Sequence, residues 1–254
     1  MTLVTYKILA ALLIFASSLI AVIYPLKLKR TTTHYGEPLE LGEAFASGIF
    51  LGVAFFHMLP EARLTFQQFF GHSHYPVAEL ICVSGFIFLL FLERLSLASP
   101  FIQPQTAIPY ILAIMLIIHS LIEGTALGIN TTFSEALMLF IAIIAHKGSA
   151  SFALCVTLMR YHFSFRHILF VMTFFSLMTP LGIGLGTGAT FFLHSETGQI
   201  VAAVFNAFAA GTFFYMSTLH HVQFHKRAHE AQGMLEFFCL LVGLVLMGVI
   251  VAWV

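Results

Sequence analysis

Residues 108–130 read IPYILAIMLIIHSLIEGTALGIN, a run in which only His119 and Glu123 can be charged near neutral pH. A helix of about 20 apolar residues crosses the roughly 30 Å hydrocarbon layer of a bilayer. His119 lies about eleven residues from either end of this run, so it falls near the middle of the membrane. An ionisable residue at that depth is costly and usually functional. The stretch therefore predicts a membrane-spanning helix with a polar site at its centre.

Comparable apolar runs recur along the whole chain. Its 254 residues are 59% hydrophobic and 9% charged, whereas a soluble domain has about 25% charged residues. The composition predicts an all-α integral membrane protein, multi-pass, with a single transmembrane domain over residues 1–254. We expect the lipid bilayer as a partner, and the zero net charge indicates no nucleic acid. The eight expected helices lie near residues 4–25, 41–61, 77–97, 108–130, 134–158, 166–193, 198–219 and 234–254.

The basic residues predict the orientation, because Lys and Arg are enriched in cytoplasmic connections. Two of them, Lys7 and Arg63, fall on one face of the membrane, and eight fall on the other. Both termini are therefore expected outside. Lys147 belongs to neither group, since it lies inside the fifth span. The eight residues expected on the cytoplasmic face are Lys27, Lys29, Arg30, Arg94, Arg160, Arg166, Lys226 and Arg227.

A short internal repeat links the second and seventh spans. Residues 45–50 read FASGIF and residues 208–213 read FAAGTF. With the orientation above, one span runs outward and the other inward. Many transporters are built from such inverted repeats, with the substrate site near the midplane. We expect a 3+2+3 inverted-repeat bundle, with a metal site between the central helices, the fourth and fifth.

The central pair also carries the most costly residues. His119 and Glu123 are four residues apart and share one face of a helix. His146 is central in the fifth span. Imidazole and carboxylate ligands suit zinc and its first-row neighbours. We therefore expect His119, Glu123 and His146 to bind a divalent metal. The alternative is a buried His–Glu hydrogen bond that only fixes helix packing.

Other polar residues are candidates for a metal pathway. His57 and Glu61, again four apart, end the second span, where they suit an entrance, although polar residues at an interface need no special explanation. His221, His225 and His229 would share one face if the last inner loop is helical. They are candidate cytoplasmic loop contacts for metal, or part of a solvated basic connector. The outer loop with His72 and His74 leaves the same alternatives open.

At these residues the sequence resembles the ZIP (Zrt/Irt-like) family of metal transporters. The resemblance covers nearly the whole chain, and its specific element is the run from His119 to Gly128. Supporting elements are His57-x-x-Pro60-Glu61, the histidine-led polar start in the middle of the fifth span, and residues 206–213, NAFAAGTF. It implies transport of Zn²⁺, in some members Fe²⁺, Mn²⁺ or Cd²⁺, into the cytoplasm, with His119, Glu123 and His146 as ligands. It also implies that spans 1, 4, 5 and 6 move as a unit against spans 2, 3, 7 and 8.

The sequence departs from the family pattern at several positions. Many members have Pro where Ile122 stands. Members with a two-metal site have Asn at Ser120, an acidic residue at Lys147 and Glu at Ala150. The chain therefore resembles a single-metal branch in which the lysine ammonium replaces the second cation. We expect Lys147 and Ser120 beside the ligands or along the pathway, with Lys147 paired to Glu123 when metal is absent.

The resemblance also bears on location. The chain lacks the long histidine-rich loop between spans three and four of many eukaryotic members, which favours a bacterial inner membrane. No organic cofactor is expected, and the sequence leaves open whether two copies form a homodimer.

Two other classes of function compete with transport. A multi-span membrane zinc hydrolase acting on lipid amides would use His221 and His225, but such enzymes usually need an intramembrane Asp. The chain contains no Asp and no His-Glu-x-x-His motif. A scaffold without transport would leave the central cluster of His119, Glu123 and His146 without a purpose. We therefore expect a transporter and not an enzyme.

Overall fold

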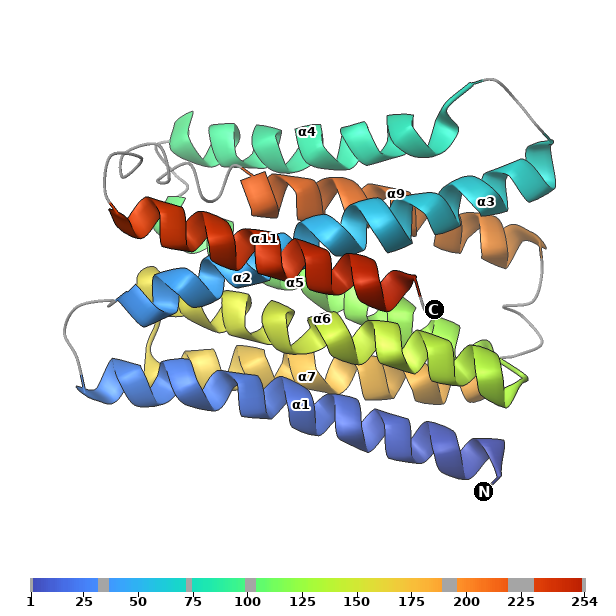
Figure 1. The fold of residues 1–254 in the computed structure, drawn as a ribbon, viewed down its shortest axis with the longest axis horizontal. Helices are drawn as coiled ribbons and strands as arrows, with labels where there is room; N and C mark the ends of the chain where they lie inside the picture. The colour runs from blue at the N-terminus through green and yellow to red at the C-terminus, as the bar shows by residue number, and fades with distance from the viewer. Residues whose placement is uncertain are drawn as a thin grey trace. The chain divides into compact units, whose positions relative to one another are not determined.

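The computed structural model describes residues 2–31, 37–71, 75–98, 104–188, 196–218 and 231–252, and these residues contain helices and no strand (Figure 1). The all-α prediction is confirmed. The helices are α1 (Leu3–Thr31), α2 (Glu37–Gly52), the π-helix η1 (Val53–Met58), α3 (Leu59–Phe70), α4 (Val77–Ala98), α5 (Pro104–Ile129), α6 (Phe133–Arg160), α7 (Phe165–Gly188), α9 (Glu196–Thr218) and α11 (Ala231–Val251).

Within these residues the helices form the eight expected spans, because α2, η1 and α3 continue one another without a break. Seven spans are long and apolar enough to cross a membrane. The remaining one, α4, has 22 residues and carries Glu79 near its start and Glu93 and Arg94 near its end. An integral multi-pass membrane protein follows from this set.

The second span is longer than predicted. It continues past Glu61 to Phe70, because α3 buries Ala62 and Phe66 in one cluster with residues of α4 and α9. Pro60, which cannot donate a backbone hydrogen bond, lies two residues after the end of η1. There the N–H of Leu59 reaches back five residues to the carbonyl of Ala54. The wider π turn therefore lets the helix pass the proline without ending.

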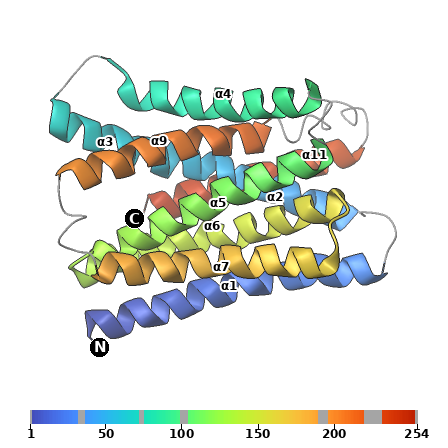
Figure 2. The same ribbon diagram turned by 180° about the vertical axis from the view of Figure 1, so that it is seen from behind.

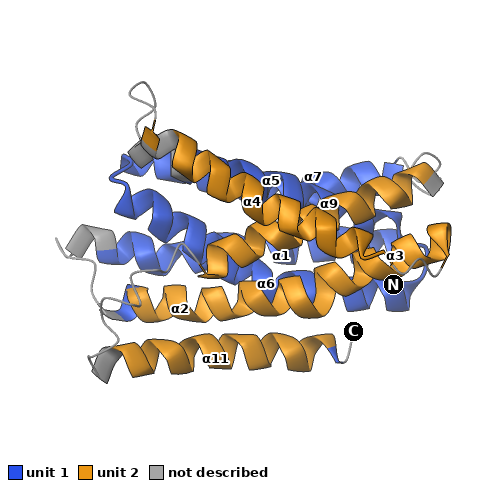
Figure 3. Ribbon diagram, turned by 90° about the horizontal axis from the view of Figure 1, so that it is seen from above, with its two compact units in different colours: residues 1–39, 109–195, 252–254 blue, residues 40–108, 196–251 orange. Residues whose placement is uncertain are grey.

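The helices group into two compact units, shown in different colours in Figure 3. Unit 1 contains residues 1–39, 109–195 and 252–254, and thus α1, most of α5, α6 and α7. Unit 2 contains residues 40–108 and 196–251, and thus nearly all of α2, with η1, α3, α4, α9 and α11. This is the grouping of spans that the family resemblance implies.

Unit 2 contains the inverted repeat. Here α4 packs along α9 (Figure 2), where a Cβ at Gly85 would overlap the carbonyl of Phe208 and one at Gly211 that of Cys82. A second helix pair, α2 with α11, repeats the arrangement. A Cβ at Gly243 would overlap the carbonyl of Phe45, and one at Gly48 the carbonyl of Leu240. FASGIF and FAAGTF thus make equivalent contacts, and the repeat predicted from six residues is a repeat of helix packing.

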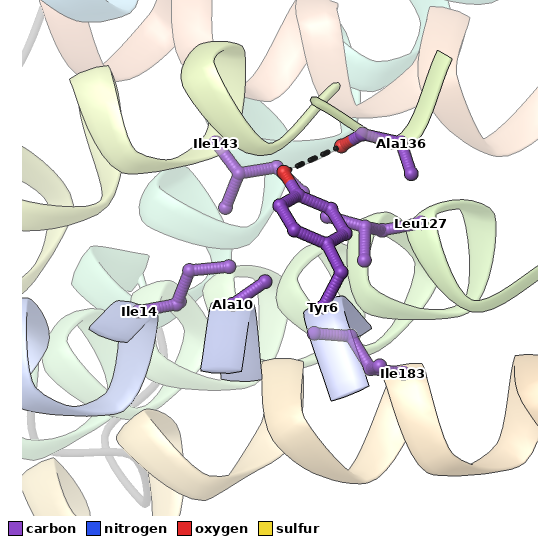
Figure 4. Close-up of a cluster of buried hydrophobic side chains, with 7 residues drawn as sticks. All are labelled: Tyr6, Ala10, Ile14, Leu127, Ala136, Ile143 and Ile183. Atoms are coloured by element: carbon purple, nitrogen blue, oxygen red, sulfur yellow. Dashed lines mark hydrogen bonds between the residues drawn. The ribbon is translucent and has the colours of Figure 1, made fainter. Parts of the chain in front are cut away.

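Unit 1 is built around α1, which packs along α6 and α7. Figure 4 shows Tyr6 among apolar side chains of α5, α6 and α7, with its hydroxyl donating to the carbonyl of Ala136 at 3.3 Å. The neighbouring Lys7 is 6% exposed, and its ammonium donates to the carbonyl of Gly128 at 2.6 Å. This carbonyl is among the last of α5, where a cation is favourable. Lys7 therefore helps to fix the end of the helix that carries His119 and Glu123.

Candidate metal site

Two antiparallel helices of unit 1 supply the candidate ligands. α5 carries His119 and Glu123, which are 5% and 9% exposed, and α6 carries His146, which is 1% exposed. Only residues 130–132 separate these helices, and Thr132 caps α6 by accepting a hydrogen bond from the N–H of Glu135. A short connection between long helices places the middle of one beside the middle of the other. This brings the three side chains together.

The three side chains form one buried cluster around a carboxylate oxygen. Oε1 of Glu123 lies 2.6 Å from Nε2 of His146 and 2.9 Å from Nε2 of His119. One ligand atom from each residue lies within 4.8 Å of the other two. The other ring nitrogen of His146, Nδ1, donates to the carbonyl of Ala142 at 2.7 Å. Such a backbone bond orients metal-binding histidines in general and leaves Nε2 facing the site.

The geometry suits a small divalent cation after a modest adjustment. Zinc binds nitrogen and oxygen at about 2.0–2.1 Å in a tetrahedral arrangement, which places neighbouring ligand atoms about 3.3 Å apart. The observed 2.6 and 2.9 Å are hydrogen-bond distances. Metal binding therefore requires each of these two Nε2–Oε1 distances to increase by less than about 1 Å. It also requires the loss of the proton shared by imidazole and carboxylate. The cluster of two imidazoles and one carboxylate can hold a metal of the zinc type.

Lys147 does not make the ion pair expected from the sequence. Among the described residues, Glu123 pairs with the two histidines and not with Lys147. The ammonium donates to the hydroxyl of Ser120 at 2.7 Å and lies 3.8 Å from the ring centroid of Phe175. The two histidines hold Oε1 of Glu123, and the ammonium is directed to Ser120 on the preceding turn of α5 instead. Lys147, 1% exposed, is stabilised by a hydroxyl and a cation–π contact instead.

The second predicted pair lies in unit 2. Nε2 of His57 is 3.9 Å from Oε2 of Glu61, and these side chains are 18% and 48% exposed. The amide of Asn206 on α9 donates to the same oxygen at 3.4 Å. No role was predicted for Asn206 from the sequence, in which it was noted only as part of NAFAAGTF. The sequence does not reveal that α9 lies beside α3. His57, Glu61 and Asn206 thus form a partly exposed polar cluster.

The remaining candidates lie outside the described residues. They are His72 and His74 in one connection, and His221, His225 and His229 in another.

Close backbone packing between α5 and α7 fixes the turn that carries Glu123, which yields a testable prediction. A Cβ at Gly124 would overlap the carbonyl oxygen of Thr179 and lie 3.0 Å from its Cα. Gly124→Ala should therefore lower the thermal stability of the purified protein, by about 1–3 kcal/mol. Gly184→Ala is the matched control on α7, because no atom lies within 4 Å of its Cβ position. Equal melting temperatures for both variants would contradict the packing described.

The chain matches known proteins over most of its length. The family described as ZIP Zinc transporter matches residues 4–100 and 99–251. The chain is 29% identical over 273 residues to Zinc transporter ZIP2 of Homo sapiens, covering 87% of each chain. It is 27% identical to human Zinc transporter ZIP1, over 82% of this chain and 76% of that one. Human Zinc transporter ZIP3 is 26% identical, over 84% and 87% of the two chains.

The fold and the buried cluster define a multi-pass membrane protein with a candidate cation site among its spanning helices. The matches extend this to a transporter of zinc or a related divalent metal ion, and not an enzyme. The chain belongs to the ZIP zinc transporter family. The matches give no support to the alternative of a zinc hydrolase.

Proposed function

We propose that the protein carries zinc into the cytoplasm and that the ion binds His119, Glu123 and His146 on the way. The observation that carries this proposal is the buried cluster of these three residues on two membrane-spanning helices. A carboxylate and two imidazoles in the hydrocarbon layer are costly without a cation to bind. The same ligands accept Fe²⁺, Mn²⁺ or Cd²⁺, so the metal preference has to be measured.

The contacts around Glu123 suggest how the ion is bound and released. The ion replaces the proton held between imidazole and carboxylate, so binding is weakened by acid. Relative movement of the two units would then expose the site to the other side of the membrane. On the side where the metal is scarce, the proton returns and the ion leaves. The buried ammonium of Lys147, fixed by Ser120, adds one positive charge beside the site and limits occupancy to one ion.

The polar cluster of His57, Glu61 and Asn206 is a suitable entrance. Its side chains combine partial exposure with imidazole and carboxylate groups, which attract a divalent cation without binding it tightly. In the proposed orientation, with both termini outside, this cluster lies near the outer surface of a bacterial inner membrane. The loop histidines His221, His225 and His229 would then face the cytoplasm, where the ion is released.

The experiment that tests the proposed function is metal uptake by proteoliposomes that contain only this protein. We expect zinc uptake that depends on the metal gradient and decreases as the pH on the loading side falls. Uptake no faster than in protein-free vesicles would contradict the proposal.

The orientation gives a separate prediction, because eight of the ten basic residues other than Lys147 fall on one face. In a variant without native cysteines, Ser73→Cys should react with an impermeant maleimide added to intact cells. Ala228→Cys should react only after the membrane is permeabilised. The reverse labelling pattern would overturn the orientation and with it the proposed direction of import.

A further inference from the structure

Two buried polar atoms near the cluster have no hydrogen-bond partner among the described residues. They are Oε2 of Glu123, on α5, and the hydroxyl Oγ1 of Thr179, on α7. Thr179 is 0% exposed. Burying a hydroxyl without a hydrogen-bond partner is unfavourable, and burying a carboxylate oxygen without one is unfavourable too. Finding one unpartnered donor and one unpartnered acceptor in the same part of unit 1 indicates that they serve each other in another state of the protein.

Helix packing places the backbones of the two residues at the same level. The Cα of Thr179 lies 3.0 Å from the Cβ position of Gly124, the residue that follows Glu123. On the next turn of α7, a Cβ at Gly182 would lie 2.8 Å from the backbone nitrogen of Thr125 and 3.0 Å from the carbonyl carbon of Gly124. The two backbones are therefore in contact directly beside the ligand. No hydroxyl of the described residues donates to Oε2 in this structure.

Thr179 also differs from neighbouring hydroxyl residues. Thr125 donates to the carbonyl of Leu121 at 2.8 Å, Ser176 to that of Met172 at 2.7 Å, and Thr187 to that of Ile183 at 2.7 Å. Each uses the carbonyl four residues earlier, which is the usual partner inside a helix. Thr179 makes no such bond. Its hydroxyl is thus available to a group outside its own helix.

We propose that Thr179 is a positioning residue for the metal site: its hydroxyl donates a hydrogen bond to Oε2 of Glu123 while Oε1 binds the ion. This inference rests on the proposed metal site. When an ion occupies the Nε2 atoms of His119 and His146, the carboxylate loses both of its present contacts. Ligating carboxylates are themselves usually hydrogen-bonded, which fixes their orientation. Lys147 does not supply this bond in the structure, where its ammonium donates to Ser120, lies over the ring of Phe175 and makes no hydrogen bond to Oε2.

A pair of substitutions separates the hydroxyl from the shape of the side chain. Thr179→Val keeps the volume and removes the donor, and Thr179→Ser keeps the donor. In purified full-length protein, zinc affinity is measured by competition with a chromophoric chelator. We expect Thr179→Val to weaken zinc binding roughly ten- to hundredfold and Thr179→Ser to stay close to wild type. In proteoliposomes the same loss should appear mainly as a higher KM for zinc.

The melting temperature of chelator-treated protein is a second measurement, and it is not expected to fall with the zinc affinity. Replacing an unpartnered buried hydroxyl by a methyl group removes an unfavourable burial. Chelator-treated Thr179→Val should therefore melt at the same or a higher temperature than wild type, although it binds zinc less tightly. A purely structural role would lower both quantities together.

The outcomes distinguish this inference from the proposed function. Wild-type affinity in Thr179→Val, together with lost binding in Glu123→Gln, would overturn the role of Thr179 and leave the site intact. Equal losses in Thr179→Val and Thr179→Ser would also overturn it, because the hydroxyl would not be the cause. Wild-type binding in Glu123→Gln would instead overturn the proposed metal site.

Discussion

Substituting any one of the three ligands should reduce zinc transport by about a hundredfold or more, with normal insertion into the membrane. The substitutions are His119→Ala, Glu123→Ala and His146→Ala, each of which removes one of the three candidate ligand atoms. Loss of a residue that only orients a metal ligand costs about ten- to hundredfold, and loss of a ligand should cost more. Initial rates of zinc uptake in proteoliposomes, normalised to inserted protein, provide the measurement.

Thr125→Ala is the matched control for these variants. Thr125 lies on the same helix, and its hydroxyl donates only to the carbonyl of Leu121 within α5. Its removal should leave uptake nearly unchanged. Full transport by Glu123→Ala would exclude Glu123 as a ligand, whatever the histidine variants do.

The second large effect is expected from changing the number of metal ions bound. Lys147→Asp combined with Ala150→Glu replaces a buried ammonium and a small side chain on α6 by two carboxylates. An ammonium has no lone pair to give to a metal, and a carboxylate has several. The double variant should therefore bind two zinc ions per chain where the wild type binds one. Equilibrium dialysis with metal analysis of the purified proteins measures this ratio.

The double variant should also depend on zinc for its stability. It buries two carboxylates near Glu123 and removes the ammonium, which is strongly unfavourable without a compensating cation. Zinc should raise its melting temperature more than that of wild type, because a ligand stabilises the folded state that binds it. Two ions bound between α5 and α6 in the wild type would refute the role given to Lys147. A ratio of one in the double variant would do the same.

Much of the fold follows from the sequence, because in the hydrocarbon layer the backbone must satisfy its own hydrogen bonds and few structures do so. Apolar runs near 20 residues predict helices, and the ends of these runs predict where most of them turn. The second span was predicted too short, since Pro60 and Glu61 resemble the end of a helix. The π turn of η1, which lets the helix continue, depends on backbone bonds that hydropathy does not reveal.

The candidate ligands could be predicted for a similar reason. His119 and Glu123 share a helical face by their spacing alone, and their depth made a function for them the simplest expectation. The contacts of Lys147 could not be predicted, because they depend on Phe175 from a third helix and on which oxygen of Glu123 the histidines use. Thr179 was missed because a threonine in an apolar helix usually bonds to its own backbone.

The internal repeat shows both the reach and the limit of sequence reasoning. FASGIF and FAAGTF could be matched by eye, whereas Gly85 and Gly243 lie in segments with little similarity to each other. Their equivalence appears only when the two helix crossings are compared. A glycine at a crossing permits close backbone approach whatever its neighbours are, so the surrounding sequence is free to differ.

The central claim is that the transported metal binds His119, Glu123 and His146, and X-ray absorption at the zinc edge tests it most directly. The protein should carry Ser in place of His72, His74, His220, His221, His225 and His229, so that these two histidine-rich connections contribute no signal. We predict zinc with two imidazole nitrogens and carboxylate oxygen at about 2.0–2.1 Å and no sulfur. In the same background, His119→Ala with His146→Ala should remove the imidazole signal. An unchanged spectrum in that variant, or sulfur ligands in either protein, would contradict the account.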